Sequence, residues 1–536
     1  MATAAAAPTT SPQAVHSKLE KKPPALGMII FGLAMAVGLI YSVTHLLGDL
    51  SGVHPTSIYP FVLLGVALLI ALGFEFVNGF HDTANAVATV IYTHSLDPHI
   101  AVALSGTFNF LGVLTSTGAV AFGIITLLPV ELILQVGAGS GFAMVFALLT
   151  AAIIWNLGTW WFGLPSSSSH TMVGSIIGVG IANQLMSVRN GTSGVDWTQA
   201  ANVGKTLLIS PFVGFVCAAI LLLIARIVLR NPKLYAAPQG DEAPPWPIRL
   251  LLIGTCSGVS FAHGSNDGQK GMGLIMLILI GTVPTAYALN HAVTPQQTAD
   301  FVAVSHETVN TIHQYVAGST SIGDPHDEVR KYVADREFTP YTMLALQQLI
   351  NDIGNETDLY KDLKKVPERF VPNLRNDMYL ASEALRLMKK SGNPKFTQSD
   401  WKVLDNYKKH IDGATKFIPT WVKVAVALAL GLGTMVGWKR IVVTVGEKIG
   451  KQHLTYAQGA AAEITAMTTI WAADNLGLPV STTHVLSSAV GGTMAANHSG
   501  LQWSTVRSLA MAWVLTLPSS MILAATLFWT FRQIGG

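Results

Sequence analysis

Residues 73–89 read GFEFVNGFHDTANAVAT and close an apolar run that is long enough to enter a lipid bilayer. This segment places five polar side chains at membrane depth: Glu75, Asn78, His81, Asp82 and Asn85. An ionisable side chain there costs roughly 2.5–3.5 kcal/mol on insertion scales, so it persists only where it pairs, binds an ion or faces water. Gly79 lies among these groups and predicts a break in the helix, which membranes tolerate only around a cavity. The segment therefore predicts a functional site inside a membrane protein.

A closely similar pattern, FAHGSNDGQKG, returns at residues 261–271. Gly79 corresponds to Gly264 and Asp82 to Asp267, and both pairs are separated by 185 residues. The same offset aligns two further polar positions: His81 with Asn266, and Asn85 with Lys270. A repeat without gaps indicates that the chain is internally duplicated.

The composition is that of a polytopic membrane protein. Of the 536 residues, 50% are hydrophobic and 12% are charged, whereas soluble domains carry about 25% charged residues. This apolar composition leads us to expect the lipid bilayer as the surrounding medium. The net charge of +3 gives no indication of nucleic-acid binding. The two cysteines, Cys217 and Cys256, lie in apolar segments, which argues against a disulfide framework or a cysteine-based metal site.

The distribution of charge divides the chain into regions. Residues 292–417 hold 16 of the 33 Lys and Arg residues and 17 of the 30 Asp and Glu residues, which predicts a soluble helical insert. The insert has no catalytic pattern, so we expect a scaffolding, oligomerisation or regulatory role. The other predicted regions are a disordered N-terminal tail (1–25), an extra transmembrane span and loop (26–57), transmembrane repeat 1 (58–248) and transmembrane repeat 2 (249–291 and 418–536).

A second pair of motifs places the insert within repeat 2. GLPSSSSH at residues 163–170 matches GLPVSTTH at residues 477–484, an offset of 314 residues. The difference between the two offsets, 314 minus 185, is 129 residues, which is close to the length of the insert. If each half crosses the membrane an odd number of times, the two halves have opposite orientations. The basic loops then lie on one side, which the positive-inside tendency makes cytoplasmic, and the insert lies outside. If either GLP segment is a re-entrant hairpin, this parity changes.

Each GLP motif predicts a half-helix that begins inside the membrane. Proline favours the first turn of a helix, and serine and threonine favour its cap. The free N–H groups and the positive dipole end of such a start attract anions. The hydroxyls expected to bind an anion there are those of Ser167, Ser168, Ser169, Ser481, Thr482 and Thr483. The alternative is that these side chains only cap or join helices; the duplication favours the anion site.

The repeated aspartates predict a matching cation. A carboxylate beside an oxyanion needs a cation or a proton between them, because like charges repel strongly in a low dielectric. We therefore expect Asp82 and Asp267 to hold a coupling ion. The groups expected to complete its shell are Asn78, Asn85 and Asn266, with unwound backbone carbonyls.

Two cationic or titratable residues lie next to these aspartates. His81 has three possible roles: a proton carrier, a metal ligand or a hydrogen-bonded structural histidine. If it binds a metal, Asp82 and Asp267 are further possible ligands. Lys270 lies three residues after Asp267, where it either forms an internal ion pair or offsets the charge of a bound anion.

Other polar residues in the apolar segments have weaker assignments. His170 and His484 follow the hydroxyl runs, and we expect them to orient these runs. Glu463 is a lone carboxylate with no counterpart in the first half, and it either joins a coupling-ion or proton site or pairs locally. Asn475 is a minor candidate of the same kind.

The four motifs together resemble those of the inorganic phosphate transporter (Pit) family, in particular its bacterial low-affinity branch. The family motif G-A-N-D-V-A-N-A appears as GFHDTANA at residues 79–86 and as GSNDGQKG at residues 264–271. The family motif P-V/I-S-T-T-H appears as PSSSSH at residues 165–170 and as PVSTTH at residues 479–484.

The resemblance covers about residues 58–291 and 418–533. It implies an all-α polytopic membrane protein of two inverted-topology repeats with broken helices and half-helix hairpins. It also implies that the hydroxyl-rich half-helices hold phosphate and that the Asp/Asn motifs hold cations. The expected protein is a multi-pass transporter of the cell inner membrane, not an enzyme, without a resident cofactor, and similar proteins often assemble as homodimers.

Two departures from the family motif bear on the coupling ion. His81 and Lys270 replace asparagines, so a titratable ring and a fixed positive charge occupy positions where Na⁺ would find oxygen ligands. We therefore expect proton symport of phosphate, either alone or as a neutral complex with a divalent metal. The alternatives are sodium-coupled phosphate transport, a sulfate permease of the same fold, an anion channel and a metal-dependent phosphohydrolase. The last lacks a recognisable nucleophile–base pair.

Overall fold

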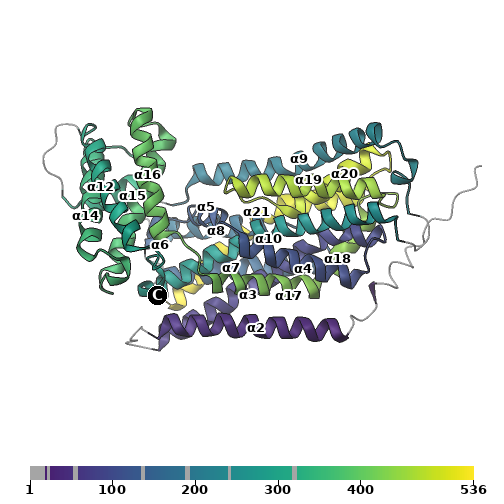
Figure 1. Cartoon of the computed structure of the whole chain (residues 1–536), viewed down its shortest axis with the longest axis horizontal. Coiled ribbons are helices and arrows are strands. Elements are labelled where there is room, and N and C mark those ends of the chain that lie inside the picture. Colours follow the sequence, from purple (N-terminus) through teal and green to yellow (C-terminus); the bar gives the residue numbers. More distant parts are fainter. Residues whose placement is uncertain are drawn as a thin grey trace, which may run out of the picture.

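The computed structural model consists of long helices that lie side by side along the molecule, with a separate group of helices at one end (Figure 1). The structure describes residues 19–20, 25–51, 58–134, 139–186, 194–238, 243–316 and 323–535. Most of the predicted N-terminal tail lies outside these residues. Within them the chain is helical, and the β-type pairing found there is an isolated bridge between Gly450 and Leu501.

Seven helices in the described residues are long and apolar enough to cross a membrane. Their bounds are α2 (Ala25–Leu50), α3 (Tyr59–Tyr92), α4 (Pro98–Thr115), α7 (Gly139–Trp161), α9 (Trp197–Val228), α17 (Thr420–Gly437) and α21 (Trp503–Gly535). Large apolar side chains point outward from them, as Leu208 and Phe212 of α9 do with 74% and 69% exposure. Such a surface is stable in lipid and not in water, so these helices form a membrane bundle.

The helix α10 (Trp246–Thr282) lies at the centre of this bundle and packs against α3, α4, α17 and α19. The helix breaks predicted at Gly79 and Gly264 are wrong, because α3 and α10 run through these positions without interruption. The glycines permit close packing instead. A Cβ at Gly79 would meet the carbonyl oxygen of Leu430 on α17, and a Cβ at Gly264 would meet that of Asn109 on α4. Both motifs therefore lie on continuous helices in tight contact with a neighbour.

The two predicted half-helices are present and pack across the halves. α8 (Ser168–Met186) follows α7, and α20 (Thr482–Ala496) follows α19 (Tyr456–Asn475). α8 packs mainly against α21 of the second half, while α20 packs mainly against α9 of the first. Each half-helix therefore packs mainly against a helix of the other half. The inverted orientation of the two halves stays a prediction.

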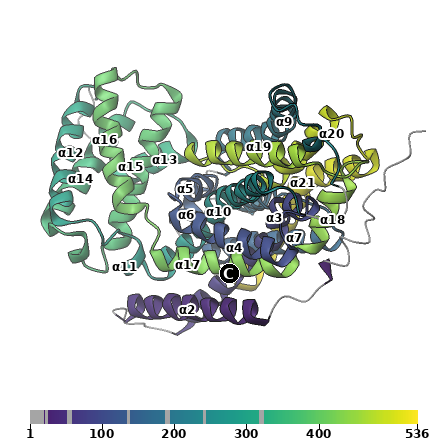
Figure 2. The same cartoon turned by 45° about the vertical axis from the view of Figure 1, so that its right-hand side comes forward.

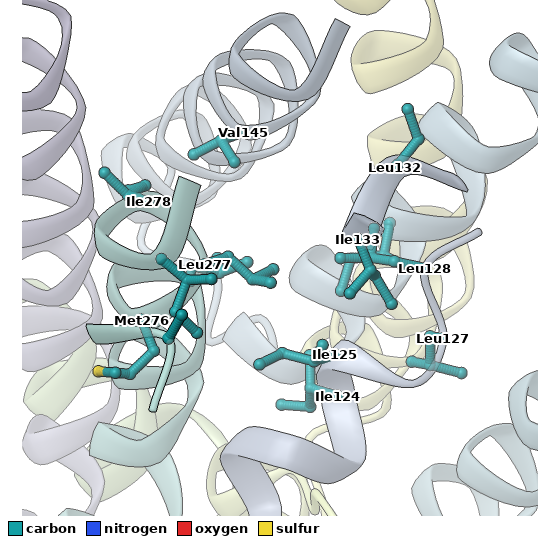
Figure 3. Packing of buried hydrophobic residues seen from close by; sticks show 14 of the residues in the cluster. Ile124, Ile125, Leu127, Leu128, Leu132, Ile133, Val145, Met276, Leu277 and Ile278 are labelled. Carbon is teal, nitrogen blue, oxygen red and sulfur yellow. The ribbon is translucent and has the colours of Figure 1, made fainter. Parts of the chain in front are cut away.

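Short helices close the bundle beside α10. Ile124 of α5, Ile133 of α6 and Val145 of α7 belong to one buried cluster with Leu277 of α10 (Figure 3). This packing fixes the second half of α10, which follows its polar motif. The short helical elements outside the insert are α5 (Ala119–Ile125), α6 (Val130–Leu134), η1 (Pro232–Leu234), α11 (Pro284–Tyr287), α18 (Lys439–Val443) and η3 (Thr444–Lys448).

The charged region folds into its own group of helices, which stands apart from the membrane bundle in both views (Figures 1 and 2). Its elements are α12 (Pro295–His313), α13 (Pro325–Asp335), α14 (Thr342–Tyr360), η2 (Leu363–Lys365), α15 (Val371–Ser391) and α16 (Gln398–Thr415). Capping boxes at Thr294 and Thr397 start α12 and α16. Arg336 and Arg386 of this group each lie 3.2 Å from Asp196, the N-cap of α9, which joins the group to repeat 1.

Candidate functional site

The half-helices α8 and α20 begin with the same local geometry. Gly163 and Gly477 adopt positive φ angles of 66° and 64°, which lets the chain turn before each start. Ser167 Oγ accepts a hydrogen bond from the backbone N–H of His170 at 3.1 Å, and Ser481 Oγ accepts one from His484 at 3.1 Å. These two hydroxyls cap their own helices, which is the alternative role considered for them.

The two half-helix starts are in direct contact. Ser169 Oγ donates to the carbonyl oxygen of Val480 at 2.5 Å. The rings of His170 and His484 lie 4.5 Å apart between centroids, and His484 stacks on Trp513 of α21 at 4.2 Å. The helix N-termini from the two halves therefore meet inside the protein.

Buried polar atoms without a partner mark the same place. Thr482 Oγ1 and His170 Nδ1 are buried, and neither has a hydrogen-bond partner within the described residues. Their residues are 5% and 6% exposed. Such groups are costly to bury unsatisfied, so they indicate where a polar guest would bind.

The second polar motif presents an ion pair to α8. Lys270 Nζ lies 2.6 Å from Asp267 Oδ2, and both side chains are fully buried. Ser168 Oγ lies 3.3 Å from Asp267 Oδ2 and 3.5 Å from Lys270 Nζ. His263 Nε2 lies 3.6 Å from the same carboxylate oxygen. The structure thus contains the internal ion pair that was one alternative for Lys270, and it brings Asp267, Lys270 and Ser168 together.

Other residues of this motif hold the segment that leads into α20. Asn266 Nδ2 donates to the carbonyl oxygen of Leu478 at 3.2 Å, and its Oδ1 accepts weakly from the N–H of Val480 at 3.5 Å. The Asn266 amide therefore binds protein backbone in this structure. A role in the ion shell would require it to exchange these partners.

Three residues that were not predicted from the sequence complete this attachment. Asp474, in the last turn of α19, accepts from Ser265 Oγ at 2.6 Å and from Gln269 Nε2 at 2.8 Å. Ser265 and Gln269 lie inside the quoted motif at residues 261–271, and Asp474 comes three residues before Gly477. A carboxylate three residues before a GLP motif was the signal that could have identified Asp474. By contrast Asn475, a minor candidate, is exposed and donates to the carbonyl of Trp471 on its own helix.

The first polar motif is described only in part. The side chains of Asp82 and Asn85 lie outside the described residues, so their predicted roles stay predictions. His81 is buried, and its Nε2 lies 3.2 Å from Thr159 Oγ1, which in turn lies 2.8 Å from Ser166 Oγ. His81 is therefore linked through Thr159 to the segment that starts α8.

Two buried glutamates bind neighbouring helices. Glu75 Oε1 accepts from the backbone N–H of Gly271 on α10 at 2.8 Å, and its Oε2 accepts from Asn78 at 3.3 Å. Glu463 accepts from the hydroxyls of Thr89 and Thr255. Glu463 lies 11 residues before Asp474 on α19, which is about 16 Å along a helix. The structure therefore does not bring Glu463 into the cluster around Asp267.

No group of three or more His, Cys, Asp or Glu residues in the described part of the chain could hold a metal ion. The cluster brings together two converging helix N-termini, their hydroxyls, one ammonium group and the carboxylate of Asp267. A bundle of membrane helices with such a site at its centre defines a multi-pass membrane transporter.

The chain belongs to the phosphate transporter family, whose profile matches residues 78–524. It is 40% identical over 499 residues to the low-affinity inorganic phosphate transporter PitA of Escherichia coli (strain K12), covering 88% of this chain and 97% of that protein. It is 38% identical to PitB of the same strain, covering 89% and 98%. The low-affinity inorganic phosphate transporter of Buchnera aphidicola subsp. Acyrthosiphon pisum (strain APS) is 40% identical, covering 87% and 96%.

A solved structure, "The sodium-dependent phosphate transporter", aligns with a TM-score of 0.49 at 19% sequence identity and covers 88% of this chain and 100% of that chain. The family resemblance deduced from the four motifs is confirmed by the family profile. With its seven apolar helices, the chain is a multi-pass protein of the inner membrane.

Proposed function

We propose that this protein imports inorganic phosphate across the inner membrane by secondary active transport coupled to protons. The observation that carries the proposal is the meeting of α8 and α20, whose N-termini converge beside Ser168, Lys270 and Asp267. The relatives that share about 40% of the sequence are named as low-affinity inorganic phosphate transporters, which supports phosphate as the substrate.

Phosphate suits the chemistry of this cluster. Each helix start offers backbone N–H groups and a positive dipole end, and Lys270 adds a full positive charge. Ser168 and Thr482 occupy equivalent positions at the two starts, so their hydroxyls are expected to donate to phosphate oxygens. The buried Thr482 hydroxyl has no protein partner in the described residues, so a bound anion would satisfy it.

Proton coupling is supported by the charge that lies against Asp267. With an ammonium group 2.6 Å from its carboxylate, a sodium ion at the same oxygen would meet strong repulsion. A proton avoids this conflict, because it can neutralise a carboxylate, be carried by a histidine or travel on phosphate itself. We propose in addition that phosphate can enter as a neutral complex with a divalent metal, because neutralising the anion lowers the cost of moving it through the membrane.

Uptake of radiolabelled phosphate into proteoliposomes tests the coupling. A pH gradient, acidic outside, is expected to stimulate uptake, and a sodium gradient of equal size is not. Stimulation by sodium alone, or by neither gradient, would overturn the proposal. Competition by equal concentrations of unlabelled sulfate separates a phosphate carrier from a sulfate permease, and uptake that never exceeds the imposed phosphate gradient would indicate a channel.

The metal and the assembly need separate measurements. Removing divalent metals with a chelator is expected to lower uptake if metal phosphate is a substrate, and unchanged uptake would contradict that part of the proposal. A homodimer is also proposed, because similar proteins often assemble in this way. Native mass spectrometry of the detergent-solubilised chain should show twice the mass of 57.0 kDa, and a monomer alone would contradict it.

A further inference from the structure

Glu463 joins three helices of the bundle through two threonines. It lies fully buried on α19, and its two carboxylate oxygens accept hydrogen bonds from Thr89 of α3 and Thr255 of α10. Gly459, one turn earlier on α19, faces the same threonine, and a Cβ there would make an ordinary van der Waals contact of 3.5 Å with the Cβ of Thr89. The carboxylate therefore ties repeat 1 and repeat 2 together.

Both threonine hydroxyls have a second acceptor on their own helix. Thr89 Oγ1 also lies 3.2 Å from the carbonyl oxygen of Ala86, and Thr255 Oγ1 lies 3.1 Å from that of Leu252. Threonine hydroxyls commonly bind the preceding turn of their helix in this way. Each hydroxyl can therefore leave Glu463 without becoming an unsatisfied buried group.

Glu75, the other buried glutamate described in the membrane bundle, lacks this freedom. Glu75 accepts from a backbone N–H, that of Gly271, which cannot turn toward another acceptor as a hydroxyl can. Moving Glu75 would break this hydrogen bond to a charged carboxylate, and the backbone N–H could not follow it. Of the two carboxyl groups, Glu463 is thus the one whose contacts can be exchanged at low cost.

The charge around Glu463 favours a group that changes its protonation. In the described residues its hydrogen-bond partners are the neutral hydroxyls of Thr89 and Thr255, and the thiol of Cys256 on α10 lies near it. An ionised carboxyl group without a cation is expensive at membrane depth. A proton is the partner that removes this cost.

We propose that Glu463 is a proton-operated clamp of the transport cycle. This proposal rests on the proposed proton-coupled function. Ionised, Glu463 accepts from both threonines and holds α3, α10 and α19 together. Protonated, Glu463 can still share hydrogen bonds with the two hydroxyls, but these bonds lose the strength that the negative charge gives them, so α3, α10 and α19 separate more easily.

The position of the clamp indicates what it closes. Glu463 lies two turns after the start of α19, which follows the basic residues Lys448 and Lys451. Thr255 lies six residues after Arg249, whose Nε donates to the carbonyl of Ser95 at 2.8 Å. The clamp is thus near the end of the bundle with the basic loops, about 16 Å along α19 from Asp474. Uptake of one proton by Glu463 opens the end of the bundle with the basic loops for phosphate. Release of this proton to the same side restores the contacts of Glu463 with the two threonines.

The test uses the full-length chain in proteoliposomes and compares two assays. Phosphate counterflow at equal pH on both sides measures movement of the loaded carrier, and accumulation under an imposed pH gradient measures coupling. Glu463→Gln cannot change its charge, so it is expected to lose gradient-driven accumulation by about tenfold or more, and a larger loss of accumulation than of counterflow assigns the defect to coupling. Accumulation equal to that of the wild type would overturn the clamp.

A second variant covers the case in which Glu463→Gln does not fold. Thr89→Val with Thr255→Val keeps the carboxyl group but removes both donors to its ionised form. The pH profile of gradient-driven uptake is expected to move to higher pH by about one unit. Thr468→Val is the matched control, because its hydroxyl is exposed on α19 and bonds only to the carbonyl of Ile464 on its own helix in the described contacts.

The outcomes separate this inference from the proposed function. If the wild-type protein shows no stimulation by a pH gradient, the proposed function fails. If the wild type is stimulated and the Thr89/Thr255 double variant keeps the wild-type pH profile, the clamp is wrong and the proposed function stands. A shift in the double variant that Thr468→Val does not show supports the clamp.

Discussion

The imidazole rings of His170 and His484 lie 4.5 Å apart, and they come from equivalent positions of the two sequence repeats. Each is the third residue after the serine that caps its half-helix. Their contact shows that α8 and α20 begin at the same point inside the protein. The expectation that these histidines orient the hydroxyl runs is consistent with this packing.

The hydrogen bond between Ser169 and Val480 should be needed to hold the two helix starts together. Ser169→Ala leaves the Val480 carbonyl without this donor and is expected to lower the stability of the folded protein by about 1 kcal/mol. Thermal unfolding in detergent measures the change. Ser508→Ala is the control, because this exposed hydroxyl bonds to Ser504 on its own helix. Equal unfolding temperatures for the two variants would contradict the prediction.

Thr482→Val should separate binding from stability. The Thr482 hydroxyl is buried without a partner in the described residues, so its removal is not expected to lower the unfolding temperature. If it donates to phosphate, the KM for uptake rises about tenfold, the value of one hydrogen bond to a charged group. The control is Thr493→Val on the same helix, whose hydroxyl bonds to the carbonyl of Val490 at 2.9 Å. An unchanged KM for Thr482→Val would exclude this hydroxyl from the phosphate site.

Lys270 and Asp267 should depend on each other. Lys270→Gln removes the ammonium group from a buried carboxylate and is expected to destabilise the protein by about 3–5 kcal/mol. Lys270→Gln combined with Asp267→Asn removes both charges and should recover most of this loss. Transport should stay low in the double variant, because the site has lost its fixed positive charge. A double variant that is no more stable than Lys270→Gln alone would show that the two residues do not act as a pair.

Local features of the site could be predicted from the sequence. The starts of α8 and α20 follow from the Pro-Ser and Ser-Thr pattern of the GLP motifs, because a helix cap depends on residues next to each other in the chain. Asp267, Lys270 and Ser168 were each identified as candidates, and the structure brings these three together.

Features that depend on tertiary packing could not be predicted in this way. Gly79 and Gly264 indicated broken helices, but a glycine also permits close helix contact, and only the positions of α17 and α4 decide between these roles. The same holds for Asn266, whose partners Leu478 and Val480 are more than 200 residues away. The motif gives the residue type and not its partner.

Asp196 should hold the insert against repeat 1. Its carboxylate caps α9 and lies 3.2 Å from both Arg336 and Arg386. Asp196→Asn keeps a capping side chain and removes the charge, so α9 should remain folded while α13 and α15 become more exposed to hydrogen exchange. Asp405→Asn is the control, because it breaks an exposed ion pair with Lys389 within the insert. Equal exchange in the two variants would mean that Asp196 does not hold the insert.

Asp377 should make the stability of the insert depend on pH. Burial, and to a lesser extent the nearby acids Glu356, Asp324 and Asp352, raises the pKa of its carboxyl from 3.8 to about 7. The folded insert therefore binds a proton that the unfolded chain releases above pH 4, so its stability decreases as the pH rises from about 4 to about 7.

Asp377→Asn is neutral throughout this range and should remove the effect. At pH 8 the variant insert is expected to be more stable than the wild type by about 2 kcal/mol, while the two should be equal near pH 4. Hydrogen exchange of the α15 segment in the full-length protein, corrected for the intrinsic pH dependence of exchange, measures this difference. Glu307→Gln, an exposed position on α12, serves as the control. The same protection of α15 in wild type and Asp377→Asn at pH 8 would show that burial of this carboxyl does not destabilise the insert.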